Sequence, residues 1–115
     1  MQITLLKSKI HCATVTQANL HYMGSITIDA TLMANCGLFP GEQVHVVNNS
    51  NGERIVTYVI QGPADSGCIC LNGAAARKFQ VGDEVIIMSY ATMTPDEAVH
   101  HKPQVIFPNS ENHLL

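Results

Sequence analysis

LFPGEQVHVV at residues 38–47 and FQVGDEVIIM at residues 79–88 are two copies of one sequence pattern. Each copy contains a glycine, then an acidic residue, and then a run of mainly apolar residues rich in valine and isoleucine. Gly41 and Gly82 suit a backbone that turns at positive φ, and the residues after them are typical of strands that enter a shared core. Two such halves predict a mostly β protein built as a barrel with pseudo-two-fold symmetry.

The segments around the two copies add further strands. Asn51-Gly52 is a strong hairpin signal, and it joins a strand near residues 43–48 to another near residues 53–61. Because side chains alternate along a strand, the second strand has two distinct faces. One face carries Arg54, Val56 and Tyr58, and the other carries Ile55, Thr57 and Val59.

Short helices and a tail complete the expected elements. Residues 29–36 are typical of a short helix with Asp29 as its N-cap, and Thr94-Pro95 is typical of the start of another. We also expect a helical turn at residues 74–77 and a strand at residues 84–92. The tail after Pro108 is polar, so we expect it to be frayed.

Length and composition limit the class of protein. The chain has 115 residues, which fits one domain with a single core. Charged residues make up 13% of the chain, about half the usual share of ~25%, while apolar residues make up 46%. A monomer with so few charged residues would leave much apolar surface in contact with water. We therefore expect a large part of the surface to be buried between subunits.

Charge and hydropathy argue against two classes of partner. The net charge is −3 and the six lysines and arginines are scattered, so the clustered basic face that nucleic acid requires is not expected. No apolar stretch approaches the ~20 residues that span a bilayer. The segment Met1–Lys7 lacks the charged and apolar blocks of a secretory signal, so we expect a cytoplasmic protein.

The four cysteines are expected to be free thiols, because nothing indicates an oxidising compartment. Cys68 and Cys70 share one face of an apolar strand, which favours buried packing over metal ligation. His100-His101 lacks the spacing of a ligand pair on a helix and is read as a solvated loop. A small metal protein that uses His11, Cys12, Cys68 and Cys70 is the weakest alternative, and we expect no metal.

The tetrapeptide Tyr22-Met23-Gly24-Ser25 carries the candidate chemistry. The Ser25 hydroxyl can attack the Gly24 carbonyl, with glycine leaving that carbonyl open and allowing a strained turn. Collapse gives an ester, elimination gives dehydroalanine, and hydrolysis releases ammonia and leaves a ketone, the pyruvoyl group. Taken alone, a Gly-Ser pair is more typical of a flexible bend.

Three further motifs accompany this pair: Lys9-Ile10-His11, Gly52-Glu53-Arg54 with Thr57-Tyr58, and Asn72-Gly73-Ala74-Ala75-Ala76-Arg77. In order and spacing, from about Lys9 to Pro103, the chain resembles the aspartate 1-decarboxylases, small pyruvoyl enzymes that make β-alanine for pantothenate synthesis. One departure is Cys12, where the family usually carries arginine, and we assign it no role.

The resemblance implies a six-stranded double-psi β-barrel with short helices. It also implies cleavage between Gly24 and Ser25, which gives residues 1–24 (the β chain) and residues 25–115 (the α chain). The cofactor would be the pyruvoyl group formed from Ser25, with no metal and no pyridoxal phosphate. The ketone would hold the amino group of L-aspartate as a Schiff base and withdraw electrons during loss of the carboxylate.

The resemblance also implies roles for the surrounding residues. Thr57 matches the threonine that hydrogen-bonds the oxyanion during cleavage and that contacts substrate, and Tyr58 matches the proton donor. Further substrate contacts would come from Arg54, Lys9, His11, Asn72, Gly73, Ala74 and Ala75. From the residues alone, Lys9 and His11 fit a surface stripe equally well, and the partner of each substrate carboxylate is left open.

Thr57 and Tyr58 are neighbours and should point to opposite faces of their strand. Either the strand bulges there, or the site lies between subunits, as in the family's homotetramer. Spontaneous maturation and maturation assisted by a helper protein both stay open. The main alternative function is an uncleaved, non-catalytic double-psi barrel, a binding or oligomerisation module in which Gly24-Ser25 is only a loop.

Overall fold

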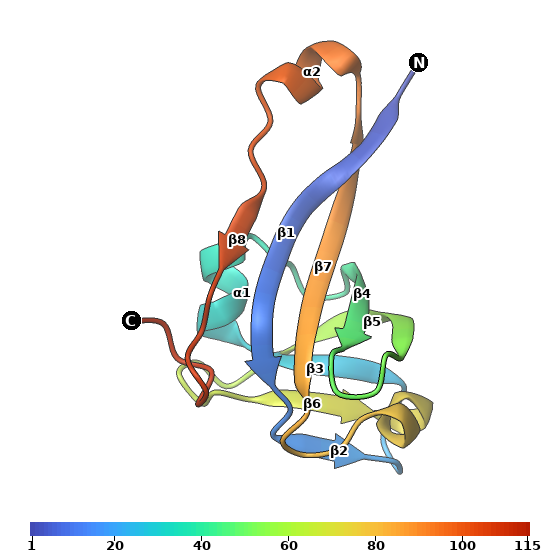
Figure 1. Cartoon of the computed structure of the whole chain (residues 1–115), viewed down its shortest axis with the longest axis vertical. Helices are drawn as coiled ribbons and strands as arrows, with labels where there is room; N and C mark the ends of the chain where they lie inside the picture. The colour runs from blue at the N-terminus through green and yellow to red at the C-terminus, as the bar shows by residue number, and fades with distance from the viewer.

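The computed structural model describes residues 1–115 as an eight-stranded sheet folded over into two layers around one core (Figure 1). The strand order is β2-β6-β3-β5-β4-β7-β1-β8. The long strands β1 and β7 run side by side, and β2, β3 and β6 cross them. The elements are β1 (Ile3–Thr14), β2 (Gln17–Asn19), β3 (Ser25–Asp29), α1 (Ala30–Cys36), β4 (Gln43–Asn48), β5 (Arg54–Gly62), β6 (Ile69–Asn72), the 3-10 helix η1 (Gly73–Lys78), β7 (Glu84–Met93), α2 (Pro95–Val99) and β8 (Gln104–Ile106).

The two copies of the sequence repeat make the same backbone hydrogen bonds. The Gly41 N–H donates to the Val59 carbonyl at 2.7 Å, and the Gly82 N–H donates to the Val15 carbonyl at 2.8 Å. In each copy the acceptor residue's own N–H donates back to the acidic residue after the glycine, at 3.0 and 2.9 Å. Both glycines have the expected positive φ, +83° and +94°. The predicted pseudo-two-fold barrel is therefore confirmed.

The prediction of six strands is wrong, because the structure has eight. Val15 and Thr16 belong to neither β1 nor β2, and their N–H groups bond across to the carbonyls of Asp83 and Ile69. This interruption separates β1 from β2. The other addition is β8, a C-terminal segment that pairs in parallel with β1 at the sheet edge.

The hairpin and the short helices agree with the sequence analysis. Gly52 has a φ of +78° in the turn between β4 and β5. The Asp29 carboxylate caps α1 by accepting from the Thr31 N–H at 2.8 Å, and Thr94 and Glu97 form a capping box at α2. None of these helices is both long and apolar enough to cross a bilayer.

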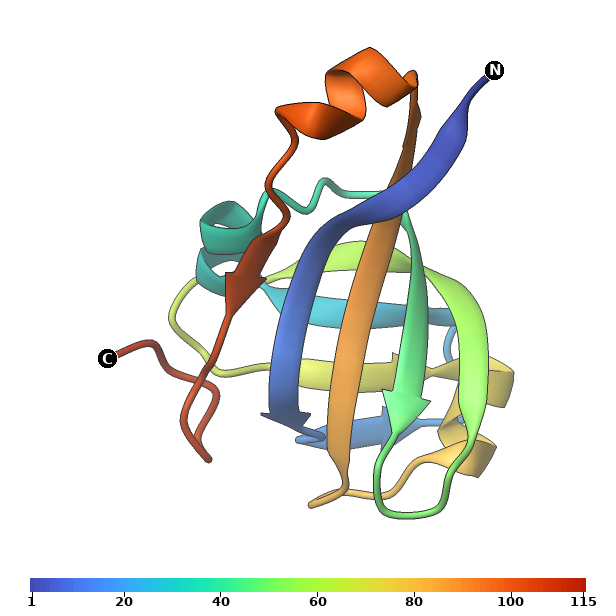
Figure 2. The same ribbon diagram turned by 45° about the horizontal axis from the view of Figure 1, so that its top comes forward.

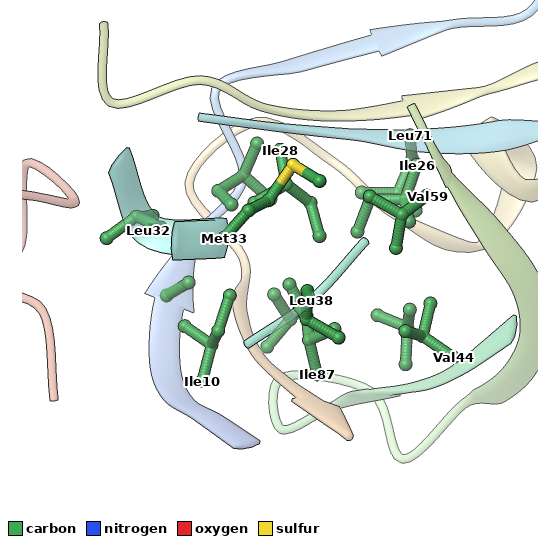
Figure 3. Packing of buried hydrophobic residues seen from close by; sticks show 14 of the residues in the cluster. Ile10, Ile26, Ile28, Leu32, Met33, Leu38, Val44, Val59, Leu71 and Ile87 are labelled. Carbon is green, nitrogen blue, oxygen red and sulfur yellow. The ribbon is translucent and has the colours of Figure 1, made fainter. Parts of the chain in front are cut away.

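The core lies between the two layers and consists of 17 buried residues. Figure 3 shows side chains of β1, β4 and β7 facing side chains of β3, β5 and β6. Leu32 and Met33 of α1 join the same cluster (Figure 2 shows α1 beside the barrel). The labelled strand residues in that view are Ile10, Val44, Ile87, Ile26, Ile28, Val59 and Leu71.

The C-terminal tail is anchored, so the expected fraying is wrong. Asn112 is fully buried, and its Oδ1 accepts from the Thr14 N–H at 2.7 Å. Its Nδ2 donates to the carbonyls of Thr14 at 2.7 Å and Gly67 at 2.8 Å. Leu114 packs against the core. One amide thus ties a polar tail to the end of β1 and to the loop before β6.

Asn112→Ala should lower the free energy of unfolding by about 2 to 4 kcal/mol. The change leaves three backbone groups without their partner, and it puts alanine at a φ of +62°, which asparagine tolerates better. Chemical denaturation of both proteins measures the difference. Glu111→Ala, at the exposed neighbouring position, is the control and should change stability by less than about 0.5 kcal/mol. Equal stability of the two variants would contradict the anchoring role of Asn112.

Candidate active site

The candidate site is a cavity along a free edge of β5. On one side β5 pairs with β4 from Arg54 to Tyr58, but on the other side it pairs with β3 only from Val59 to Gly62. The unpaired stretch faces a cavity of about 460 Å³, which falls within the usual range for small-molecule sites. The cavity is lined by Gly24, Ile55, Val56, Thr57, Tyr58, Ala74, Ala75 and Lys78.

Thr57 and Tyr58 both line this cavity although they point to opposite faces of β5. Burial alternates along the strand as expected, with Thr57 half-buried and Tyr58 38% exposed. The ladder between β4 and β5 has no register shift, so the proposed bulge is wrong. Because the cavity lies beside the strand edge, it is reached from both faces.

Gly24 lies level with Thr57. Ile26 pairs with Val59 in the parallel ladder between β3 and β5, and extending that register by two residues brings Gly24 beside Thr57. Both residues line the cavity.

The position whose backbone requires a glycine is Gly73 and not Gly24. Gly24 does not have a left-handed φ, and a Cβ added there would meet no atom within 4 Å, so the strained turn expected at this position is absent. Gly73 has a φ of +66°, and a Cβ there would lie 2.8 Å from the Cα and N of Gly24. Gly73 therefore lets η1 approach the backbone of the Gly24-Ser25 segment.

Ser25 is fully buried at the start of β3, where hydrogen bonds hold its hydroxyl from two sides. Its Oγ donates to the Met23 carbonyl at 3.1 Å. Asn72, directly opposite in β6, donates from Nδ2 to Ser25 Oγ at 3.0 Å and to Thr27 Oγ1 at 2.9 Å. Asn72 was expected in the substrate loop, but in this structure both of its N–H groups are used inside the protein.

A fourth side chain, Cys70, belongs to this cluster. Its thiol donates to Asn72 Oδ1 at 3.1 Å, and Cys70 is only 6% exposed. Burial, together with the neighbouring Cys68, raises the pKa of the Cys70 thiol. No polar role was expected for Cys70 or Thr27. The two-residue spacing of Cys70 and Asn72 nevertheless indicates that both side chains lie on one face of a strand.

Lys78 is the only charged side chain that lines the cavity, and it was not predicted. It lies at the end of η1, where its Nζ forms an ion pair with Glu53 Oε2 at 3.1 Å. Ala74 and Ala75, which were predicted to contact substrate, line the same side of the cavity. This wall therefore combines small side chains with one lysine whose charge is paired with Glu53.

Three predicted substrate contacts lie away from the cavity of their own chain. Arg54 Nη2 is 3.4 Å from both His45 Nδ1 and the Tyr90 hydroxyl oxygen. Lys9 and His11 lie on β1, which β4 and β7 separate from β5 in the sheet order. The His11 ring instead packs edge-on against Phe107, with 5.6 Å between the ring centroids.

The residues of the metal alternative do not form a ligand cluster. No group of three or more histidine, cysteine, aspartate or glutamate side chains is arranged to hold an ion. Cys12, Cys36, Cys68 and Cys70 are all free thiols, as expected.

The fold and the site define a double-psi β-barrel with a buried serine whose hydroxyl is hydrogen-bonded to Asn72 and to the Met23 carbonyl. The computationally designed double-psi barrel msDPBB_sym2 has a TM-score of 0.54 to this chain at 18% identity, covering 77% of this chain and 99% of the design. A second, rationally designed double-psi barrel has a TM-score of 0.51 at 17% identity, covering 67% of this chain and 90% of its own.

Sequence comparison identifies the family of this double-psi barrel. The chain belongs to the aspartate decarboxylase family, whose sequence profile matches residues 1–115. The aspartate 1-decarboxylase of Phocaeicola vulgatus is 64% identical over 110 residues, which cover 96% of this chain and 95% of the relative. The aspartate 1-decarboxylase of Caldicellulosiruptor bescii is 57% identical over 115 residues, which cover 100% of this chain and 90% of the relative.

Gly73→Ala should destabilise the protein by about 2 to 5 kcal/mol, because the new Cβ combines a left-handed φ with a backbone clash at Gly24. Gly24→Ala is the matched control and should cost less than about 1 kcal/mol, since the space around its Cβ is open. Thermal unfolding of the two variants measures the difference. A Gly73→Ala protein as stable as Gly24→Ala would show that η1 does not need to approach this segment so closely.

Proposed function

We propose that this protein is a pyruvoyl-dependent aspartate 1-decarboxylase that converts L-aspartate to β-alanine and CO2 for pantothenate synthesis in the cytoplasm. Membership of the aspartate decarboxylase family supports the reaction. The observation that carries the proposal is the buried Ser25 hydroxyl, which is held by hydrogen bonds to the Met23 carbonyl and to Asn72. The residue directly before it, Gly24, lines a substrate-sized cavity.

In the self-processing reaction, Ser25 Oγ attacks the Gly24 carbonyl carbon. The new bond joins Oγ to that carbon, the peptide C–N bond breaks, and the hydroxyl proton passes to the freed amine. Loss of the proton on Cα of residue 25 then breaks the Cβ–Oγ bond and releases Gly24 as a carboxylate. Water replaces the nitrogen of the dehydroalanine, ammonia leaves, and residue 25 becomes the pyruvoyl group.

Two neighbours support these steps. Thr57, level with Gly24 across the β3–β5 register, donates a hydrogen bond to the oxyanion formed by the attack. Asn72 donates to Oγ, the atom that leaves with the Gly24 carboxylate, so the same N–H stabilises the charge that develops on it.

The residues around the cavity fit a pyruvoyl group at position 25. Tyr22, Met23 and Gly24 are exposed, so this segment is free to move away from Ser25 once the backbone is cut. The ketone supplies an electron sink that allows the α-carboxylate of bound aspartate to leave as CO2. Tyr58 then donates a proton to the substrate carbon, and Ala74 and Ala75 leave the main chain accessible to the ligand.

The partner of each subunit is a further copy of the chain in a homotetramer. Large apolar side chains are exposed on the β5-β4-β7-β1-β8 half of the sheet, including Val56 of β5 at 54% and Phe107, directly after β8, at 66%. Lys9, His11 and Arg54 do not line their own cavity. In the proposed tetramer these side chains complete the anion-binding pocket across a subunit contact, where they bind the substrate carboxylates.

Purified wild-type protein should convert on ageing into residues 1–24 and 25–115, and the larger piece should react with a hydrazine at its amino terminus. Ser25→Ala should fold and stay intact, because it lacks the attacking hydroxyl. Ser110→Ala, an exposed serine in the tail, is the control and should be cut like wild type. Intact-mass measurement follows all three. A wild-type chain that stays uncut and unlabelled would favour the non-catalytic barrel, and cutting that needs added cell extract would identify a helper protein.

Thr57→Val and Tyr58→Phe should separate maturation from turnover. Thr57→Val removes the oxyanion donor and should slow cleavage roughly 100- to 1000-fold. Tyr58→Phe should be cut at the wild-type rate yet form β-alanine at least ~100-fold more slowly, since it lacks the proton donor. Ile55→Val, another change in the cavity lining, controls for packing and should leave cleavage unchanged. Rapid cleavage of Thr57→Val, or normal turnover by Tyr58→Phe, would remove the corresponding role.

A further inference from the structure

We propose that Cys70 is a positioning residue for self-processing, because its thiol holds the Asn72 carboxamide with the NH2 group toward Ser25. This inference rests on the proposed function and extends it to a residue outside the cavity. Cys70 does not touch the bond to be cut, and it acts through Asn72 alone.

The β3–β6 ladder brings the participating side chains together. Ser25 pairs with Asn72 and Thr27 pairs with Cys70, so all four side chains lie on one face of two adjacent strands. The intervening residues, such as Ile26 and Leu71, face the core and are fully buried. The polar cluster is therefore built by the pairing register and does not depend on a flexible loop.

Each polar atom of Asn72 has a partner in the observed orientation of the amide. Ser25 already donates its hydroxyl hydrogen to the Met23 carbonyl, so its oxygen presents lone pairs to Asn72 and needs a donor there. Both Nδ2 hydrogens are used, one on Ser25 and one on Thr27. Oδ1 is left facing Cys70, 3.1 Å from the sulfur.

The thiol is the group that makes this orientation favourable. A protonated thiol can donate a weak hydrogen bond to an amide oxygen, as Cys70 does to Asn72 Oδ1, and its sulfur is only a weak acceptor for an amide N–H. Burial raises the pKa of Cys70, so the hydrogen stays on sulfur at neutral pH. Without it, Oδ1 would be buried without a partner, and the amide could turn over to accept from the hydroxyls of Ser25 and Thr27 instead.

The reversed amide would hinder cleavage at a definite step. With Oδ1 toward Ser25, an acceptor would face Oγ just as Oγ becomes the ester oxygen, which has no hydrogen to donate. The departing oxygen would then meet a lone pair where the native arrangement supplies an N–H. Cleavage should slow while the folded barrel persists, since the core contacts of β6 are unchanged.

The test measures the rate at which intact chain becomes residues 1–24 and 25–115, by mass, in full-length variants. Cys70→Ala should cleave roughly tenfold more slowly than wild type, and Cys70→Ser, which restores a donor, should return to within about threefold. Cys68→Ala is the matched control two residues upstream and should cleave at the wild-type rate, because the Cys68 thiol does not contact Asn72. Should Cys70→Ala fail to fold in thermal unfolding, Cys70→Val fills the site without a donor and should be equally slow.

A double-mutant comparison separates positioning from simple packing. If Cys70 acts through Asn72, adding Cys70→Ala to Asn72→Ala should slow cleavage no further. Two results would overturn this inference and leave the proposed function standing. One is that Cys70→Ala is cleaved as fast as wild type, and the other is that the double variant is slowed by the full additional factor. A wild-type chain that is never cut would overturn the proposed function, and this inference with it.

Discussion

The antiparallel ladder between β3 and β6 is the constraint on which the candidate site depends. It sets Ser25 opposite Asn72 and leaves Ile26, Ile28 and Leu71 in the core. Because side chains alternate along a strand, a slip of one residue would bury the serine among apolar side chains and turn the isoleucines outward. The core thus stabilises the register, and the register determines which groups surround the Ser25 hydroxyl.

Much of the fold could be predicted from local pattern. The two glycine turns, the Asn51-Gly52 hairpin and the helix capped by Asp29 each depend on residues close together in the chain, and all three are present. The strand number could not be predicted, because the break at Val15 comes from bonds to distant carbonyls. The prediction of a frayed tail was wrong for the same reason. Composition describes the tail as polar, whereas Asn112 bonds to Thr14, 98 residues away, and to Gly67, 45 residues away.

The candidate site was predictable where motif and strand geometry coincide. Gly24 and Thr57 were expected to act together, and both line the cavity. Lys78 was missed, because it enters the cavity only through the path of η1. Lys9 and His11 are the opposite case. A motif marks them, yet within one chain two strands, β4 and β7, lie between β1 and β5 in the sheet.

Residues 1–24 contain β1 and β2, which pair with strands in both layers of the barrel, β7 and β8 on one side and β6 on the other. A break after Gly24 would therefore not create a releasable propeptide. The smaller fragment would be interwoven with the larger one, and it could escape only when the whole domain melts. The rate at which the two fragments exchange would then equal the rate of global unfolding. Cutting the backbone would break the chain in two without shortening the lifetime of the folded barrel.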